Sequence, residues 1–588
     1  MNFLKNVLAS ILGCFIALGL IFMFFLVMIS VVSASLGTDN STVTVKDNSV
    51  LEIEFKTPLK DYAERVYLED FDYLMEDFDG LNSVLKAIKY AKTDAKIKGI
   101  SLKSNNGNLR GIAFIQELRA ALEDFKTSGK FVLAYNDIVP QSDYYLQTVA
   151  DKVYVSPLGE LTFRGLSSEV LFFKDIQEKT GVKQQVIRHG KYKSAVEPFL
   201  NDKMSDENRQ QISELLNAMW QVIVTDVSKS RNVSVEKLND VANNLLARTP
   251  KLALENGLID GVLFKDEFEQ ILCEKTGEKQ IADLNFINIE DYAESVSTKK
   301  KNKSKDKIAV IYAEGDIVYG SGRVGLVSDG VMIESLREAT DDEKVKAIVL
   351  RINSPGGSAL ASELIHREIE QVRKHKKVYV SMGNYAASGG YYIACNADRI
   401  FAEEGTITGS IGVFGVVPNV SELAEKWGIN AEQVTTHAHS LEYSLFEKPS
   451  ESFIKEATES VENTYNTFIE RVASGRKMTP EQVNEVAQGR VWSGKAALNA
   501  GLVDEIGNLE KTLAFASAEN GLKNYDVVSY PIFTTNVKNL FNDYSTAMKT
   551  SFLQQEMGEE AYKMYEKLKT ISQQKGVQAQ MIFEVNLD

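Results

Sequence analysis

The chain has few of the residues that build disulfide frameworks, zinc sites and nucleic-acid surfaces. Its 588 residues include only three cysteines, Cys14, Cys273 and Cys395, without the paired spacing of a disulfide framework or a zinc site. The formal net charge of -15 leaves no evident basic face for phosphate, so nucleic acid is not expected as a partner. We therefore expect no metal site and no other cofactor.

Charged residues are absent from one long stretch near the start, Asn6 to Thr38. The stretch exceeds the roughly 20 apolar residues that cross a bilayer. A cleaved signal peptide is the alternative, but its apolar core would span only about 7–15 residues. Lys5 precedes the stretch while Asp39 and Asp47 follow it, so the positive-inside rule places most of the chain outside the cytoplasm. We predict that residues 1–38 form a cytoplasmic tip and an uncleaved transmembrane anchor.

The rest of the chain contains the same unit twice. The segment YYLQTVADKVYVSPLG from Tyr144 aligns with YYIACNADRIFAEEGT from Tyr391, at an offset of 391 − 144 = 247. Upstream, DAKIKGISLK from Asp94 aligns with DEKVKAIVLR from Asp342, at an offset of 342 − 94 = 248. Self-similarity over such lengths predicts a tandem duplication.

Each copy alternates short apolar runs with amphipathic stretches, which is typical of βα units around a buried, mostly parallel sheet. In the second copy, strands are predicted at 307–317, 345–354, 376–384 and 397–404, and helices at 331–342 and 358–375. The predicted division after the anchor is a first repeat at 39–296, a lysine-rich linker at 297–307, a second repeat at 308–530 and a C-terminal helical extension at 531–588. The fold class is therefore α/β.

One serine of the second copy stands among residues with almost no side chain, in Ala386-Ala387-Ser388-Gly389-Gly390. Ser388 follows a predicted strand and precedes a predicted helix. Such a turn presents a hydroxyl beside backbone N–H groups, and the following glycine allows an acyl group to approach the backbone. We therefore expect Ser388 to be an exposed turn residue and the nucleophile of an acyl transfer.

A nucleophilic serine also needs N–H donors for the developing oxyanion. The segment INSPGGS, Ile352 to Ser358, ends a predicted strand with two glycines before a helix. Gly357 or Gly356, together with Gly389, is therefore the candidate oxyanion hole. The alternative is that these glycines only make tight turns.

The base that would activate Ser388 is less evident. None of the five histidines comes with a triad carboxylate, so a Ser-His-Asp site is disfavoured. In RHGKYKSAVEPF of the first copy, an apolar segment follows Lys193 and can withdraw it from solvent, which would lower its pKa. Local chemistry alone does not distinguish Lys193 from Lys191.

A family resemblance distinguishes them. NSPGGS, AASGGYYIA and TITGSIGVFG of the second copy, together with KYKSAVEPF of the first, resemble the signal peptide peptidase A family of membrane-anchored serine proteases, in its long duplicated form, protease IV. The resemblance implies that Ser388 is the nucleophile, that Lys193 is the general base, and that Ser410 in TGSIG orients the lysine amine. The implied fold of each copy is the Clp-protease/crotonase-like unit.

The same resemblance implies a substrate and a location. The substrate would be the remnant of a cleaved signal peptide or a similar hydrophobic peptide. The enzyme would be a homo-oligomer, such as a tetramer, anchored in the bacterial inner membrane with its catalytic part on the periplasmic side.

The duplication indicates where the site assembles. Position 388 corresponds to Gln141 in the first copy, and position 193 corresponds to Ser440 or Leu441 in the second. Each copy therefore holds only half of a serine–lysine pair. We expect the site to form where two copies meet, either within one chain or between chains.

Two other functions are compatible with parts of this pattern. A crotonase-type acyl-CoA enzyme also holds an oxyanion with paired N–H groups, but it would need acidic catalytic residues and an adenine pocket. A non-catalytic membrane scaffold would retain the duplication for assembly alone.

Overall fold

The structure is a computed structural model that describes residues 15–24, 44–105, 107–297, 304–320, 322–535 and 577–581, with isolated positions nearer both ends of the sequence. Of the predicted anchor at 1–38, residues 15–24 and a few single positions are described, as exposed helix, and the rest lies outside the described residues, as does most of the predicted helical extension at 531–588. Within the described part, no helix is both long enough and apolar enough to cross a membrane.

The first copy is built on a sheet of six parallel strands in the order β8-β6-β5-β4-β1-β9. The strands are β1 (Ser49–Ile53), β4 (Ile97–Leu102), β5 (Phe131–Val139), β6 (Lys152–Leu161), β8 (Gly261–Val262) and β9 (Asn285–Asn288). The helices that accompany them are α2 (Leu81–Ala91), α3 (Ile112–Lys126), α4 (Gln141–Gln147), α7 (Asp206–Arg231), α8 (Val235–Asn243), α9 (Pro250–Glu255), α10 (Lys265–Thr276) and α11 (Ile289–Ser297).

The second copy repeats this order in an eight-stranded sheet, β19-β17-β15-β13-β10-β21, in which β16 also pairs with β15 and with β20. Its strands are β10 (Lys307–Glu314), β13 (Val345–Ser354), β15 (Lys377–Ala387), β16 (Arg399–Ala402), β17 (Ile407–Gly409), β19 (Val491–Ser493), β20 (Glu505–Ile506) and β21 (Asp526–Tyr530). Its helices are α12 (Asp329–Asp341), α13 (Ala359–Val372), α14 (Gly389–Ala394), α15 (Ser421–Lys426), α16 (Glu451–Arg476), α17 (Pro480–Val486), α18 (Gly494–Asn499) and α19 (Leu509–Glu519).

The predicted elements of the second copy are confirmed to within a few residues. The order β6-β5-β4-β1-β9 of the first copy corresponds to β16-β15-β13-β10-β21 of the second. The duplication therefore extends from the sequence to the strand order.

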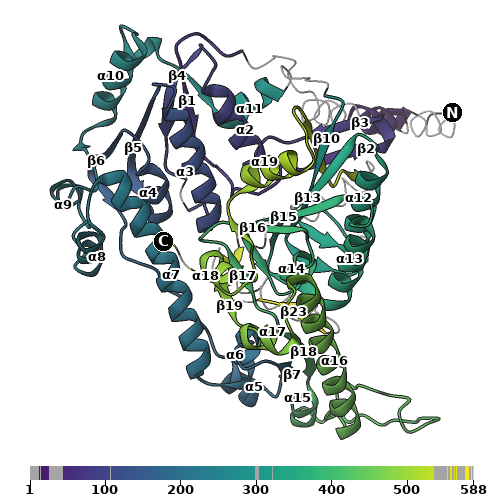
Figure 1. Cartoon of the computed structure of the whole chain (residues 1–588). Coiled ribbons are helices and arrows are strands. Elements are labelled where there is room, and N and C mark those ends of the chain that lie inside the picture. Colours follow the sequence, from purple (N-terminus) through teal and green to yellow (C-terminus); the bar gives the residue numbers. More distant parts are fainter. Residues whose placement is uncertain are drawn as a thin grey trace.

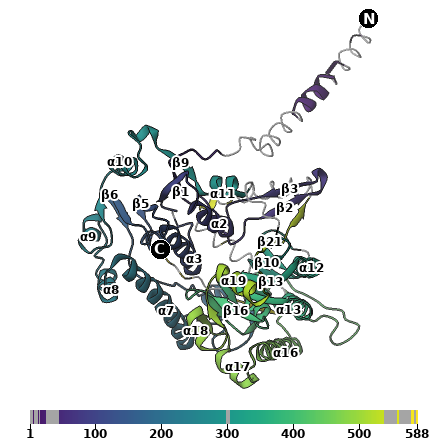
Figure 2. The same cartoon turned by 45° about the horizontal axis from the view of Figure 1, so that its top comes forward.

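A third sheet joins the two copies. Its order is β12-β11-β14-β23-β18-β7, with β7 (Lys183–His189), β11 (Asp316–Val318), β12 (Leu326–Ser328), β14 (Gly356–Ser358), β18 (Val413–Asn419) and β23 (Gln578–Gln580). Strand β7 of the first copy pairs antiparallel with β18 of the second from Lys183 opposite Asn419 to His189 opposite Val413. Figure 1 shows β7 and β18 together at the bottom of the molecule, beside the long helix α16. Figure 2 shows the two copies side by side from a second direction.

Part of the predicted C-terminal helical extension is not helical. Residues 578–580 form β23 inside the joining sheet, and β22 (Phe533–Thr535) pairs with β2 (Arg65–Leu68), which also pairs with β3 (Tyr73–Glu76). The prediction of a helix was wrong for these residues, because open strand edges in the two copies provide backbone partners that the local sequence does not reveal.

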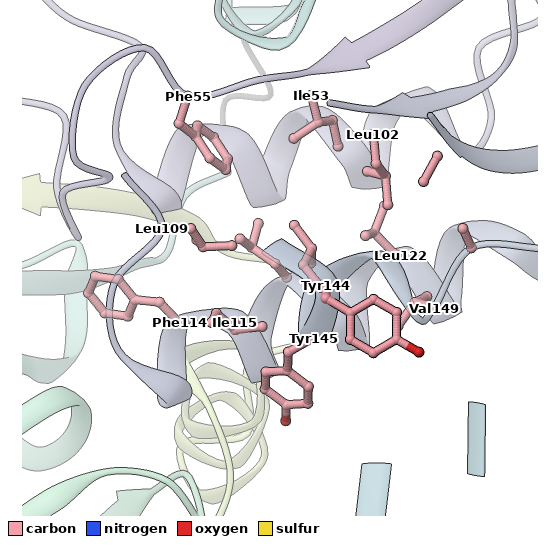
Figure 3. Close-up of a cluster of buried hydrophobic side chains, with 14 of the residues drawn as sticks. Ile53, Phe55, Leu102, Leu109, Phe114, Ile115, Leu122, Tyr144, Tyr145 and Val149 are labelled. Atoms are coloured by element: carbon pink, nitrogen blue, oxygen red, sulfur yellow. The ribbon is translucent and has the colours of Figure 1, made fainter. Parts of the chain in front are cut away.

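The core of the first copy lies between its sheet and the helices α3 and α4. Figure 3 shows the side chains that meet there, which are Ile53, Phe55, Leu102, Leu109, Phe114, Ile115, Leu122, Tyr144, Tyr145 and Val149. The same apolar cluster reaches Ala387 of β15, Val491 of β19 and Met581 near the C-terminus. The first core is therefore continuous with the residues next to Ser388.

A buried ionic cluster also fixes the two copies against each other. Arg351 of β13 lies 2.7 Å from a carboxylate oxygen of Asp61 and 2.6 Å from one of Glu117, which belongs to α3, and the arginine side chain is fully buried. Removing one partner of such a cluster leaves an uncompensated buried charge, which costs about 3–5 kcal/mol. The cluster therefore strongly disfavours any shift of one copy relative to the other.

Candidate active site

Ser388 lies between the end of β15 and the start of α14. Its backbone has φ 54° and ψ −112°, an unusual conformation for a residue that is not glycine. Backbone strain of this kind is found at functional sites, where the surrounding structure holds it in place. The Ser388 N–H donates to the Gly409 carbonyl at 2.7 Å, which ties the turn to β17.

The small residues around Ser388 allow close packing. A Cβ atom added to Gly390 would lie 2.7 Å from the Ser354 carbonyl oxygen, and one added to Gly389 would lie 2.7 Å from Ser362 Oγ. Side chains at these positions would push α14 away from β13 and α13. The expectation of an exposed turn was wrong, because Ser388 is completely buried by these contacts and by the first copy.

Lys193 lies in the turn that follows β7, just before a 3₁₀ helix at Ser194–Val196. The loop at 488–489 of the second copy holds this turn, because the Tyr192 N–H donates to the Gln488 carbonyl at 2.9 Å. A Cβ atom on Gly489 would lie 2.6 Å from Lys193 Cβ, so a glycine is needed there. Lys193 is 1% exposed, whereas Lys191 is exposed and its Nζ lies over the Tyr192 ring.

The structure brings the lysine of the first copy to the serine of the second within one chain. Lys193 Nζ lies 2.8 Å from Ser388 Oγ, 3.1 Å from Ser410 Oγ and 3.2 Å from the Ser410 carbonyl oxygen. Ser410 follows β17, and its N–H donates to the Arg490 carbonyl at 2.6 Å, which fixes its position. The amine therefore contacts the hydroxyls of two serines from adjacent turns.

Burial holds the pKa of Lys193 well below its ordinary value. Desolvation disfavours the ammonium form, and among the described residues no carboxylate lies within ion-pair distance of the Nζ to restore it. The environment therefore favours a neutral amine that can accept a proton from the neighbouring hydroxyl.

The candidate oxyanion glycines also meet at this point. A Cβ atom on Gly356 would lie 2.8 Å from Gly389 N, so the two turns are in contact, and Gly356 and Gly357 have φ values of 104° and 153°. Gly389 N belongs to the first turn of α14, where N–H groups have no acceptor within the helix. The Gly356 N–H donates to Ser354 Oγ at 3.2 Å, and Gly357 is paired with Ile317 of β11 and with Ala579 of β23.

None of the five histidines hydrogen-bonds to Ser388. His189 lies 2.8 Å from a Glu462 carboxylate oxygen and stacks on Tyr465, and His366 is buried against the edge of Tyr392. In the described part of the chain, no cluster of residues could hold a metal ion. Among the residues that the structure describes, the Ser388 hydroxyl instead accepts from the Lys193 amine at 2.8 Å and donates to the Gly412 carbonyl at 3.4 Å.

The corresponding place in the first copy contains a structural residue. Gln141 begins α4 as Gly389 begins α14, and its side chain accepts from the Arg164 and Gly165 N–H groups at 2.8 and 3.1 Å. At this position the first copy therefore has the Gln141 amide, which holds the loop at 164–165, whereas the second copy has the Ser388 hydroxyl beside the Lys193 amine.

Sequence reasoning missed two features of the site. Gly489 and Gly412 surround the Lys193 side chain, and residues 577–581 of the C-terminal extension lie against the glycine turns. Nothing in the sequence around Gly489 indicates that this glycine packs against the lysine. The pairing of residues 577–581 depends on a partner strand more than two hundred positions away.

Comparison with known proteins gives consistent results. The model of peptidase family S49 matches residues 124–278 and again residues 370–523. Protease 4 of Haemophilus influenzae is 35% identical over 510 residues, which cover 83% of this chain and 82% of that protein. A protein of Enterococcus faecium named as a signal peptide peptidase SppA is 39% identical over 204 residues, 34% of this chain and 59% of its own length. The solved structure of a ClpP1 mutant from Listeria monocytogenes matches over 35% of this chain and 94% of the ClpP1 chain. The two are 17% identical with a TM-score of 0.24, a likeness too low to support a conclusion.

Proposed function

The chain belongs to peptidase family S49 and is a serine protease, and we propose that it works through a Ser388–Lys193 dyad to degrade cleaved signal peptides and similar hydrophobic peptides. The observation that carries the dyad is the 2.8 Å separation of Lys193 Nζ and Ser388 Oγ at a buried point where the two copies meet.

The proposed mechanism has two steps. Ser388 Oγ attacks the peptide carbonyl carbon while its proton passes to the neutral Lys193 amine, and the carbonyl oxygen becomes an oxyanion beside the Gly389 and Gly357 N–H groups. The ammonium then gives its proton to the leaving amine, which breaks the peptide bond and leaves an ester on Ser388. In the second step, water attacks the ester and gives a proton to Lys193, which returns it to Ser388 Oγ as the bond between that oxygen and the acyl carbon breaks and the acid leaves.

The local structure supports each role. A positioned general base contributes roughly 10²–10⁴ in rate, and each oxyanion donor roughly 10²–10³. Ser410, which contacts the lysine amine at 3.1 Å, is proposed to hold it toward Ser388. Because one copy supplies the base and the other the nucleophile, neither copy alone would be active.

The substrate and the location rest on other features. The name of the Enterococcus faecium relative and the apolar surroundings of Ser388 support hydrophobic signal-peptide remnants as substrates. The uncharged run from Asn6 to Thr38 supports a single anchor in the bacterial inner membrane, with the catalytic part on the periplasmic side. We further propose that the enzyme is a homo-oligomer.

A serine-directed fluorophosphonate probe tests the nucleophile. We expect the full-length protein in detergent to be labelled at Ser388 and to cleave a leucine- and alanine-rich peptide. Ser388→Ala should lose both properties while it still folds and unfolds cooperatively, with a slightly lower Tm because the Lys193 amine loses one hydrogen-bond partner. The matched control is Ser440→Ala, at an exposed position, which should behave like the wild type. Labelling or turnover that persists in Ser388→Ala would contradict the assignment.

A further inference from the structure

A strand from the C-terminal part of the chain lies in the proposed active site. Strand β23 pairs antiparallel with β14 so that Ala579 lies opposite Gly357, and on its other edge Gln578 lies opposite Phe414 of β18. Two further backbone hydrogen bonds extend the pairing, from Met581 N to the Pro355 carbonyl at 2.9 Å and from Ala359 N to the Val577 carbonyl at 3.2 Å. We call Val577–Met581 the inserted strand.

The inserted strand passes directly over the residues next to the nucleophile. A Cβ atom on Gly356 would lie 2.1 Å from the Ala579 carbonyl oxygen, and one on Gly389 would lie 3.1 Å from it. Met581 lines, together with Lys193 and Ser410, a residual space of only about 10 Å³ beside the amine. A substrate peptide that reaches Ser388 would therefore have to occupy the same place.

The two faces of the inserted strand differ in polarity. Successive side chains of a strand point to opposite faces. Val577, Ala579 and Met581 share one face and pack into the apolar clusters of the two copies. On the other face, Gln580 Nε2 donates to an Asp316 carboxylate oxygen at 3.1 Å. The groove thus accommodates apolar side chains at alternate positions.

A contact farther along fixes the other end of this segment. The carbonyl oxygen of Leu587 accepts a hydrogen bond from Gln141 Nε2 at 2.8 Å, and Leu587 is buried. Gln141 is the first-copy counterpart of Ser388. The segment is thus held at the catalytic position of the second copy and at the corresponding position of the first.

We propose that the groove between β14 and β18 binds an extended peptide substrate with apolar side chains at alternate positions, and that the inserted strand is an internal competitor that occupies this groove. The proposal rests on the proposed function. Peptides that add a strand to an open sheet edge gain affinity from backbone hydrogen bonds and specificity from alternate side chains. A substrate then binds only to molecules in which the inserted strand has moved out of the groove. Its apparent Kd equals the intrinsic Kd divided by the fraction of molecules with an open groove.

Ala579→Arg tests the competition. Ala579 is completely buried against the glycine turns, so an arginine cannot be accommodated and the inserted strand should leave the groove. For a fluorogenic apolar peptide we expect KM to fall about tenfold or more with kcat unchanged, because only the open fraction changes. Met557→Arg introduces the same residue at an exposed position of the same extension and should leave KM unchanged.

A binding measurement separates this inference from the proposed function. In the Ser388→Ala background, Ala579→Arg should bind a fluorescein-labelled peptide with the sequence of residues 575–583 at least about tenfold more tightly by fluorescence anisotropy. Tighter binding without hydrolysis by the Ser388-containing protein would overturn the proposed function and leave the competition in place. Hydrolysis with neither KM nor peptide affinity changed would overturn the competition alone.

A milder variant covers the case in which Ala579→Arg does not fold. Gln580→Ala removes a side-chain amide that hydrogen-bonds to Asp316 and should lower KM about two- to fivefold, in the same direction. An unchanged or raised KM in this variant would overturn the competition.

Discussion

Replacing Lys193 by methionine should abolish catalysis and stabilise the fold. The side chain is 1% exposed, and burial lowers the pKa of its amine well below 10.5. In the unfolded chain the amine keeps its proton up to about pH 10.5, whereas in the folded chain it loses that proton at a lower pH. The unfolded state therefore binds more protons within that window, and the stability of the wild type rises with pH there.

The size of the effect follows from this difference. The proposed role as base requires the folded amine to be neutral at a working pH such as 8, and an amine that is neutral when folded and protonated when unfolded costs about 1.36 kcal/mol per pH unit below 10.5, or about 3 kcal/mol at pH 8. Methionine has a similar length and no charge, but it loses the contacts of the amine with Ser388 and Ser410, which are worth about 0.5–1.5 kcal/mol each. We expect Lys193→Met to raise the free energy of unfolding by about 1–2 kcal/mol at pH 8 and by less, or not at all, at pH 10.

Urea unfolding of the two proteins across this pH range measures the stability, and peptide hydrolysis measures the activity. The kcat/KM of the wild type should rise with pH through one ionisation well below 10.5, because the neutral amine is the active form. Lys193→Arg should be as inactive as Lys193→Met, since a guanidinium stays protonated. Lys191→Met, at an exposed position, is the matched control and should leave both stability and activity unchanged. A Lys193→Met protein that is less stable than the wild type at pH 8, or a Lys193→Arg protein that retains substantial activity, would refute the reasoning.

Three further changes test the surroundings of the dyad. Ser410→Ala should lower kcat about tenfold with KM unchanged, because the amine loses one of the groups that orient it; an unchanged kcat in steady-state assays would refute that role. Gly356→Ala places a Cβ atom 2.1 Å from the position of the Ala579 carbonyl oxygen in a backbone conformation that suits glycine. In the Ser388→Ala, Ala579→Arg background, where the inserted strand should have left the groove, it should weaken peptide binding by anisotropy, and unaltered binding there would argue against the groove. Arg351→Met leaves two carboxylates buried without a cation and should lower the free energy of unfolding by about 3–5 kcal/mol in urea titrations. A loss below about 1 kcal/mol would show that the buried cluster does not hold the two copies together.

The sequence by itself determined the α/β class, the duplication and the strand and helix positions of the second copy. The runs at 345–354 and 376–384 predict β13 and β15 because buried parallel strands need continuous apolar residues, a requirement that acts locally. The small residues around Ser388 and the glycine pair before Ser358 indicated a nucleophile turn and a second turn, since such conformations restrict the residue type at each position. Through the family motif, the sequence also indicated Lys193 rather than Lys191.

Only the tertiary structure decided how these parts meet. The burial of Ser388, the low pKa of Lys193 and the contact with Ser410 depend on β7 of one copy pairing with β18 of the other, and no local pattern encodes that distance. The strand at 578–580 is the clearest case, because its conformation is set by the open edges of β14 and β18 rather than by its own sequence. Local sequence constrains backbone conformation and burial, whereas desolvation of an amine and pairing of distant strands arise only when the two copies pack together.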